Sequence, residues 1–314
     1  MIWKCFTLSL WLLLGLPLSS HAQSNGCDEP RLNVVATVGM IADVAGHIGG
    51  DCVTLITMMG PGVDPHVYSA TLRDVENLFE ADLILYGGLH LEARLIDVFE
   101  QIHESLGTTV IPVSESIAET SVLHVEDSNA TDPHIWMDVS LWMDAARAIR
   151  DGFVTALPEN ASYITANAEA YLAQMEALDV YVMEQIQRIP ETQRILITAH
   201  DAFQYYSRRY AVDVYAPQGI STQAEVGVQD VRETIDLILS RQIPAIFVET
   251  SVSPAVVEAI QAGAQARGWD LQIGGQLYSD AMGTAGTLGG TYLGMIQSNT
   301  DTIVSSLLGE NETE

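Results

Sequence analysis

Short apolar, β-branched runs alternate along the chain with segments whose apolar residues recur at helical spacing. This alternation predicts parallel strands joined by helices, because consecutive parallel strands need a long crossover connection. The expected strands lie at 33–38, 53–58, 83–86 and 109–113 in the first half, and at 194–198, 212–215, 245–248 and 271–273 in the second. Helical patterns such as 228–240 and 255–266 separate the later strands. The predicted fold class is α/β, with two similar lobes that each hold a parallel sheet of about four strands flanked by helices.

A much longer helical pattern lies between the two lobes. Apolar residues recur at helical spacing over 161–188, Asn160 is placed to cap the first turn, and Pro190 follows the end. A helix of this length extends about 42 Å, enough to run rigidly along both lobes and fix their orientation. A long surface helix inside one domain is the alternative. We expect an N-terminal lobe at 23–159, a connecting helix at 160–189 and a C-terminal lobe at 190–314.

The first residues have the pattern of a secretory signal peptide. Lys4 precedes the apolar run 6–18, which is too short to cross a bilayer, and a small-residue cleavage motif ends at Ala22. Residues 1–22 are therefore predicted to be a signal peptide, and the mature chain is predicted to be periplasmic. No small-apolar lipobox precedes Cys27, and no later apolar run is long enough for a membrane helix. We expect neither a lipid anchor nor direct membrane insertion.

Export also bears on the state of the cysteines. Loss of Cys5 with the signal peptide leaves Cys27 and Cys52, an even pair in an oxidising compartment. A disulfide is the favoured state there. One buried thiol and one disordered thiol are the alternative.

The charge balance indicates which kinds of ligand the protein can attract. The chain holds 13 Lys plus Arg against 41 Asp plus Glu, a net charge of −28, which repels nucleic acid and anionic lipid and favours cations. Solubility of an exported protein is the weightier explanation of this acidity. The sequence contains no phosphate-binding glycine loop, no nucleophile elbow and no His-Glu-x-x-His motif. These patterns predict no nucleic-acid partner and no enzymatic activity.

Four metal-capable side chains stand just past expected strands: His66, His134, His200 and Asp280. In an open parallel sheet, ligands bind at the carboxyl ends of the strands. His66 and His134 each end an Asp-Pro-His tripeptide, and Trp136 beside the second could exclude water. Three imidazoles and one carboxylate make a closed ligand set for one dication, which the two lobes would share in the cleft between them. A hydrogen-bonded structural histidine or a turn-forming aspartate is the alternative for each residue.

The other titratable side chains fit supporting roles better. Three histidines lie within or beside helical patterns, where structural or solvent-facing positions are expected: His47, His90 and His103. His124 lies in the acidic, aperiodic segment 114–132, which predicts an exposed loop. We expect Asp64 and Glu249 to support neighbouring ligands or cap helices rather than bind an ion.

The stretches around these residues resemble those of the metal-specific (zinc/manganese) ABC-transporter periplasmic solute-binding protein family. The matching stretches are GVDPHVY at 62–68, YGGLHLE at 86–92, DPHIWMD at 132–138, TAHDAF at 198–203 and SDAMG at 279–283. The likeness covers nearly the whole mature chain. It implies two four-stranded lobes joined by a rigid helix, one ion bound between them, and delivery to a membrane permease with a cytoplasmic ATPase. We expect the receptor to be a monomer.

The ligand types rank the possible metals. Three imidazoles plus one carboxylate suit tetrahedral zinc, and the Irving–Williams order makes such a site bind zinc more tightly than manganese. Zinc is the expected ion, manganese the next, and ferrous iron is possible; binding through both oxygens of Asp280 would ease acceptance of the last two. Zinc members of the family often carry a long histidine-rich loop, which 114–132 lacks. Manganese or iron members often have a carboxylate at the position of His200.

Two other classes of function stay open from the residues alone. A secreted zinc metallohydrolase could use three histidines and one aspartate, but it needs an open coordination position. A two-lobed receptor for an organic or metal-chelate ligand would need additional arginine or aromatic groups in the cleft.

Overall fold

The computed structural model describes residues 27, 31–125 and 130–310. The predicted signal peptide and the residues that would precede a lipid anchor lie outside these ranges. Within the described ranges, no helix is both long and apolar enough to cross a membrane.

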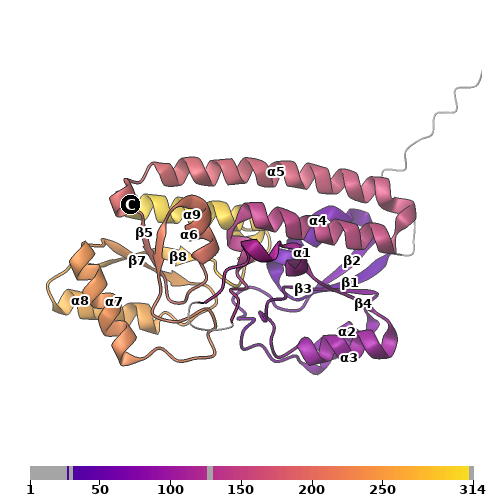
Figure 1. Ribbon diagram of the computed structural model, residues 1–314, viewed down its shortest axis with the longest axis horizontal. Coiled ribbons are helices and arrows are strands. Elements are labelled where there is room, and N and C mark those ends of the chain that lie inside the picture. Colours follow the sequence, from indigo (N-terminus) through magenta and orange to yellow (C-terminus); the bar gives the residue numbers. More distant parts are fainter. Residues whose placement is uncertain (1–26, 28–30, 126–129, 311–314) are drawn as a thin grey trace, which may run out of the picture.

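The first lobe is a four-stranded parallel sheet covered by helices on both faces (Figure 1). Its strands are β1 (Leu32–Ala36), β2 (Val53–Thr57), β3 (Leu83–Tyr86) and β4 (Thr109–Pro112), in the order β2-β1-β3-β4. The helices are α1 (Gly39–Gly49), α2 (Leu72–Glu80), α3 (Ile96–Leu106) and α4 (Val139–Ala156). Leu83, Ile84 and Leu85 are fully buried, as expected of a central strand in a sheet covered on both faces. The predicted strands of this lobe are all present.

The second lobe has four strands, but they pair two by two. The strands are β5 (Ile195–Ile197), β6 (Asp213–Tyr215), β7 (Ala245–Glu249) and β8 (Gln272–Leu277), and the parallel pairs are β5-β6 and β7-β8. The helices are α6 (Gln204–Tyr210), α7 (Val228–Arg241), α8 (Ala255–Ala266) and α9 (Tyr292–Leu308). β5 lies beside β7, and there the Glu249 carboxylate accepts from the backbone N–H groups of Ala199 and His200 at 2.7 and 2.9 Å. A side chain thus joins the two pairs where a strand ladder would otherwise run.

The long helix α5 (Ala161–Gln187) runs along both lobes (Figure 1). It contacts α1 and α4 of the first lobe and α6 and α9 of the second. Asn160 stands at its N-cap position, yet its side chain makes no capping hydrogen bond, because the helix is entered from the 3-10 turn Pro158–Asn160. The capping role predicted for Asn160 is therefore wrong. The chain divisions at residues 160 and 190 stay a prediction.

One continuous apolar core joins the two lobes beneath α5. Phe153 of α4, Tyr171 of α5, Tyr206 of α6 and Tyr292 of α9 all belong to it and are almost fully buried. A smaller core lies under the sheet and helices of the second lobe. Because rotating one lobe against the other would break the shared core, α5 and its neighbours hold the lobes in a fixed relation.

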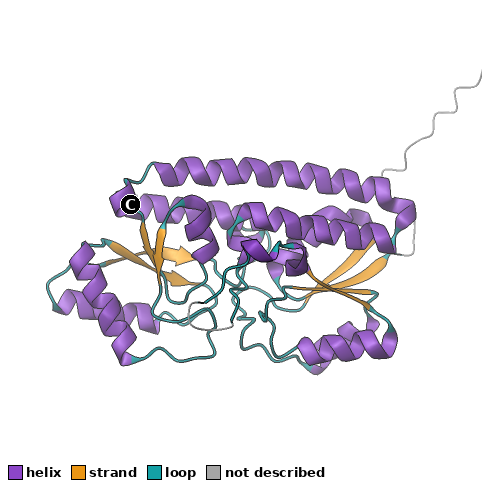
Figure 2. Ribbon diagram, in the orientation of Figure 1, coloured by secondary structure: helices purple, strands orange, loops and turns teal. Residues whose placement is uncertain are grey.

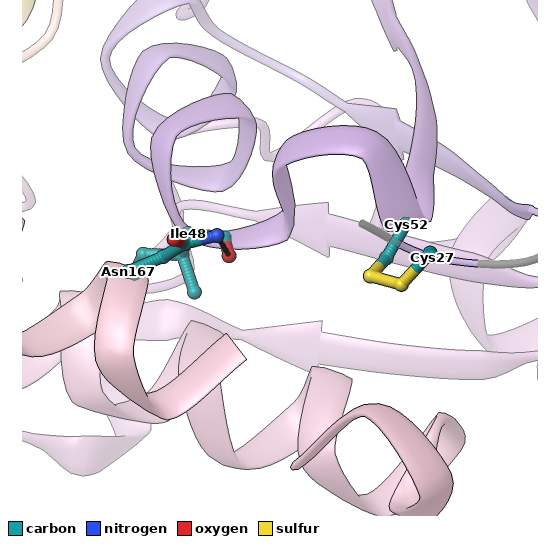
Figure 3. Close-up of a disulfide and its surroundings, with 4 residues drawn as sticks. All are labelled: Cys27, Ile48, Cys52 and Asn167. Carbon is teal, nitrogen blue, oxygen red and sulfur yellow. Dashed lines mark hydrogen bonds between the residues drawn. A yellow bond between two sulfur atoms is a disulfide. The ribbon is translucent and has the colours of Figure 1, made fainter. Parts of the chain in front are cut away.

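Cys27 and Cys52 form a disulfide, as predicted (Figure 3). It ties the start of the described chain to the residue that precedes β2. Nearby, the side-chain amide of Asn167 on α5 donates to the carbonyl oxygen of Ile48 at 3.2 Å. With a sequence separation of 25 between the cysteines, the bond stabilises the first lobe by roughly 3 kcal/mol in the chain-entropy description.

Polar bonds fasten α5 to each lobe. Toward the first lobe, the hydroxyl of Tyr171 donates to the Asp43 carboxylate at 2.8 Å. Toward the second, the buried carboxylate of Asp179 accepts from the guanidinium of Arg209 at 3.1 Å and from the hydroxyl of Tyr210 at 2.9 Å. The orientation of the lobes therefore depends on polar contacts as well as on the core.

We expect Asp179→Ala to lower the free energy of unfolding by about 2–4 kcal/mol, because it leaves a buried hydroxyl and a partly buried guanidinium without their acceptor. Urea denaturation followed by circular dichroism measures the change. Glu176→Ala, on the exposed side of the same helix, is the matched control and should change stability by less than about 0.5 kcal/mol. Equal effects of the two substitutions would contradict the bonding role of Asp179.

Candidate metal centre

The four predicted side chains meet between the lobes, where the loops of both sheets gather (Figure 2). His66 ends the turn that follows β2, His200 comes three residues after β5, and Asp280 comes three residues after β8. His134 does not follow a strand, contrary to the sequence prediction. It lies just before the 3-10 turn Ile135–Met137, where the chain returns to the cleft to begin α4.

The separations of the four ligand atoms suit a single small cation. His66 Nε2 lies 3.3 Å from His134 Nε2, and the Asp280 oxygens lie 3.3 Å from His134 Nε2 and 3.2 Å from His200 Nε2. A tetrahedron with metal bonds of the zinc–nitrogen length has edges of about 3.3 Å. All four ligand atoms lie within 4.8 Å of one another, and no ligand residue is more than 3% exposed.

Two carboxylates fix the orientation of two of the imidazoles. Asp132 Oδ1 lies 2.7 Å from Nδ1 of His134, and Glu249 Oε2 lies 2.5 Å from Nδ1 of His200. A carboxylate at this distance holds the proton on Nδ1, so the lone pair of Nε2 points toward the other ligands. This arrangement prepares both rings to bind a metal.

Several of the converging atoms have no hydrogen-bond partner. His200 Nε2 and both oxygens of Asp280 are buried without one. Buried polar atoms are normally satisfied, and without a metal the negative charge of the Asp280 carboxylate has to be balanced at this centre by protons on His134 and His200. A divalent cation that replaced these protons would bind the imidazole nitrogens and the carboxylate oxygens together, so the residues present fit a metal ion.

The electrostatic environment shifts the pKa values of the three histidines in different directions. Burial lowers the pKa of His66 to about 4, so this ring is neutral at physiological pH. Burial also disfavours charge on His134, but Asp132 and Asp280 outweigh it and raise the pKa of His134 to about 9. Glu249 and Asp280 likewise outweigh burial and raise the pKa of His200 well above its usual value. The carboxylates thus create a negative field that favours a cation at this centre.

The two carboxylates that were predicted to support neighbouring ligands, Glu249 and Asp64, do so in different ways. Glu249 holds a ligand imidazole, as described above. Asp64 instead contacts the backbone: its Oδ1 accepts from the His66 N–H at 2.9 Å. Sequence reasoning missed the role of Asp132, whose Oδ1 accepts from the His134 N–H at the same distance and also holds the ring. The repeated Asp-Pro-His tripeptide was the available signal, because each forms the same local turn.

The indole of Trp136 covers one side of the site, as predicted. Its ring centre lies 5.3 Å from that of His134, and its Nε1 donates to the carbonyl oxygen of Ser279 at 3.0 Å. Trp136 is 1% exposed, so it keeps water from this side and joins the first lobe to the residue before Asp280.

The remaining histidines lie away from the four ligands. His47 stacks on Tyr171, and Nδ1 of His103 lies 2.9 Å from the carbonyl oxygen of Thr108. His124 is half-exposed, 3.7 Å from the Glu119 carboxylate. His90 is exposed, with a left-handed backbone, φ 66°.

The segment 114–132 is less exposed than predicted. It contains the 3-10 turn Glu119–Ser121, Ser114 and Asp132 are buried within it, and residues 126–129 lie outside the described ranges. The predicted exposure holds for residues such as Glu115, Glu119 and His124, but not at the two ends, where Ser114 is buried and Asp132 enters the cleft.

We expect Glu249→Gln to weaken zinc binding by about 10–100-fold without changing the ligands. A glutamine amide has one acceptor oxygen, whereas Glu249 uses Oε1 for the Ala199 and His200 N–H groups and Oε2 for Nδ1 of His200. An amide oxygen that keeps the backbone bonds turns its NH2 group toward Nδ1, and this disfavours the tautomer that directs the Nε2 lone pair to the centre. Competition with a fluorescent zinc chelator measures the affinity. Glu258→Gln, on the exposed face of α8, is the control. A dissociation constant within threefold of wild type would contradict the role of Glu249.

The sequence of this chain is similar to those of known metal-binding proteins. The family described as zinc-uptake complex component A, periplasmic, matches residues 34–306. The zinc-binding protein TroA of Treponema pallidum (strain Nichols) is 44% identical over 300 residues, covering 96% of each chain. The manganese-binding lipoprotein MntA of Bacillus subtilis (strain 168) is 42% identical over 279 residues, covering 89% of this chain and 90% of that protein.

The fold agrees with the sequence matches. The solved structure of the periplasmic zinc-binding protein TroA from Treponema pallidum superposes with a TM-score of 0.86 at 46% identity, over 88% of this chain and 99% of that one. The chain therefore belongs to the family of periplasmic solute-binding proteins of metal ABC transporters.

Proposed function

We propose that this chain captures one divalent transition-metal ion with His66, His134, His200 and Asp280 and delivers it to the permease of an ABC importer. The observation that carries the proposal is the convergence of four buried ligand atoms, several of them without any hydrogen-bond partner. Receptors of this family are found outside the cytoplasm, and they act with an ABC permease and its ATPase. Because one chain supplies all four ligands, we propose that it acts as a monomer.

Zinc is the ion that the proposed ligand set favours. Three imidazole nitrogens and one carboxylate oxygen match the preferred ligands and geometry of zinc. The two Asp280 oxygens face different imidazoles, which supports binding through both oxygens and five-coordination. That mode would admit manganese or ferrous iron at lower affinity. The names of the relatives, one zinc-binding and one manganese-binding, agree with a site that accepts both ions.

We propose that the chain has no hydrolytic activity. A hydrolytic zinc ion keeps one position open for water, whereas four protein side chains would surround this ion. The nearest carboxylates, Asp132 and Glu249, are already engaged with ligand imidazoles and are not free to act as bases. The family is one of metal transport, which does not support the metallohydrolase or the organic-ligand receptor.

Removal of a ligand should abolish most of the binding. We expect His200→Ala to weaken zinc binding by more than about 100-fold, since it removes a ligand together with the bond between that ligand and Glu249. Zinc at a thousandfold excess over its dissociation constant should raise Tm of the wild type by roughly 10 °C, and a chelator should reverse the rise. Differential scanning calorimetry measures both effects.

His103→Ala is the matched control for that experiment, because His103 lies near the end of α3 and its ring bonds to the Thr108 carbonyl rather than to any of the four proposed ligands. It should keep the zinc-dependent rise in Tm. A wild-type melting curve that ignores zinc, manganese and chelator alike would overturn the proposed function.

We propose that the mature chain is free in the periplasm. Some relatives are named lipoproteins, MntA among them. In this chain, Cys27 is bonded to Cys52, and a cysteine in a disulfide cannot carry the thioether of a lipid anchor.

After osmotic shock of the native cell, the chain should therefore appear in the soluble periplasmic fraction. Detection by antibody in the soluble and membrane fractions measures the distribution. Cys27→Ser should leave it unchanged. Recovery of the wild type in the membrane fraction, and its release by Cys27→Ser, would contradict the proposal.

A further inference from the structure

One segment of the second lobe, residues 218–224, connects two of the proposed ligands. At one end, the backbone of Gln218 pairs with that of His200. At the other end, the side-chain amide of Gln223 donates to the carbonyl oxygen of His66 at 2.8 Å. Between them, the hydroxyl of Thr222 donates to the Asp64 carboxylate, which itself holds the backbone of His66. The segment therefore reaches across the cleft and grips the turn that carries His66.

The segment is held in shape by its own side chain. The amide of Gln218 donates to the carbonyl oxygens of Thr222 at 3.2 Å and of Ala224 at 2.7 Å. These bonds fold the segment back over Gln218 and present Thr222 and Gln223 toward the first lobe. Preorganisation of this kind reduces the entropy that is lost when the segment contacts the other lobe.

The part of the centre beside His134 is built differently. There, Trp136, Tyr205 and Tyr292 are buried, and each bonds across the lobes. Tyr205 donates to the carbonyl oxygen of Asp132 at 2.8 Å, and Tyr292 to that of Trp136 at 2.9 Å. Opening this side would expose large aromatic surface and break buried bonds, so it forms a wall.

The side of His66 is the more open one. A cavity of about 230 Å³ adjoins it, lined among others by His66, His90, Pro133, Ile220, Ser221 and Gln223. Gln223 itself is exposed, and His66 is the most exposed of the four proposed ligands, at 3%. His66 and Gln223 both line this cavity, so we infer that an ion leaves the centre on this side.

We propose that residues 218–224 form a latch that sets the rate at which the bound ion leaves. Thr222 and Gln223 are positioning residues: they hold His66 against the ion from the other lobe, and release requires both bonds to break. This inference rests on the proposed metal-binding function and adds the element that controls release. Breaking these bonds frees His66 to leave the ion, so we expect their loss to speed dissociation and to leave the association rate unchanged.

The test measures zinc release from the full chain. Zinc-loaded protein is mixed with an excess of a chromogenic chelator in a stopped-flow instrument, and association is measured separately with the metal-free protein. Loss of one such hydrogen bond should speed dissociation by about 3–10-fold, so we expect this increase for Thr222→Val and for Gln223→Ala. The dissociation constant should rise by the same factor. X-ray absorption should find the zinc ligands unchanged.

Two controls separate the latch from general loosening of the lobe. Thr222→Ser keeps the hydroxyl and should restore slow release. Gln229→Ala removes an exposed amide that bonds to Glu233 on the same helix, and this variant should release zinc at the wild-type rate.

Each outcome decides for or against the latch. Wild-type release rates in both Thr222→Val and Gln223→Ala would overturn it, as would equally fast release in Thr222→Ser and Thr222→Val, or in Gln229→Ala. Failure of the wild type to bind zinc or manganese at all would overturn the proposed function instead, and the two failures are therefore distinguishable.

Discussion

Four buried ligand atoms converge around the Asp280 carboxylate, and the protein has to hold them together until a cation arrives. Neither lobe can do this alone, because His66 and His134 belong to the first lobe and His200 and Asp280 to the second. The relation between the lobes is therefore part of the site. The shared core beneath α5, and the bonds of Asp179 and Tyr171 on that helix, maintain the relation before any ion is present.

Each imidazole is also held in place locally. A carboxylate behind His134 and another behind His200 fix the rings, and each adds negative charge close to the centre. That charge strengthens the attraction for a dication and, without one, for a proton, which explains why the pKa values of these two rings are raised. His66 has no such carboxylate at its ring and is held through its backbone instead. The three imidazoles are thus held in two different ways.

The sequence predicted those features that depend on local pattern. Apolar β-branched runs identified the strands, and the two Asp-Pro-His tripeptides drew attention to His66 and His134. Features that depend on distant side chains were not predictable. The second sheet divides into two strand pairs, and Glu249 bonds to residues about fifty positions earlier. The latch joins Gln223 to His66 across 157 positions. Asn160 shows the opposite error, since a local capping signal was overridden by the preceding turn.

A receptor of this kind must bind its ion tightly and still give it up, and the two demands conflict if every ligand is held equally firmly. The asymmetry of the centre resolves the conflict. His134 and His200 are fixed by short bonds to buried carboxylates, behind a wall of buried aromatic rings, so weakening either ring would also disturb the core. His66 depends on two bonds from a partly exposed segment that lies next to a cavity. A permease that displaced this segment would remove one ligand and open the route out, while the rest of the site stayed intact for the next ion.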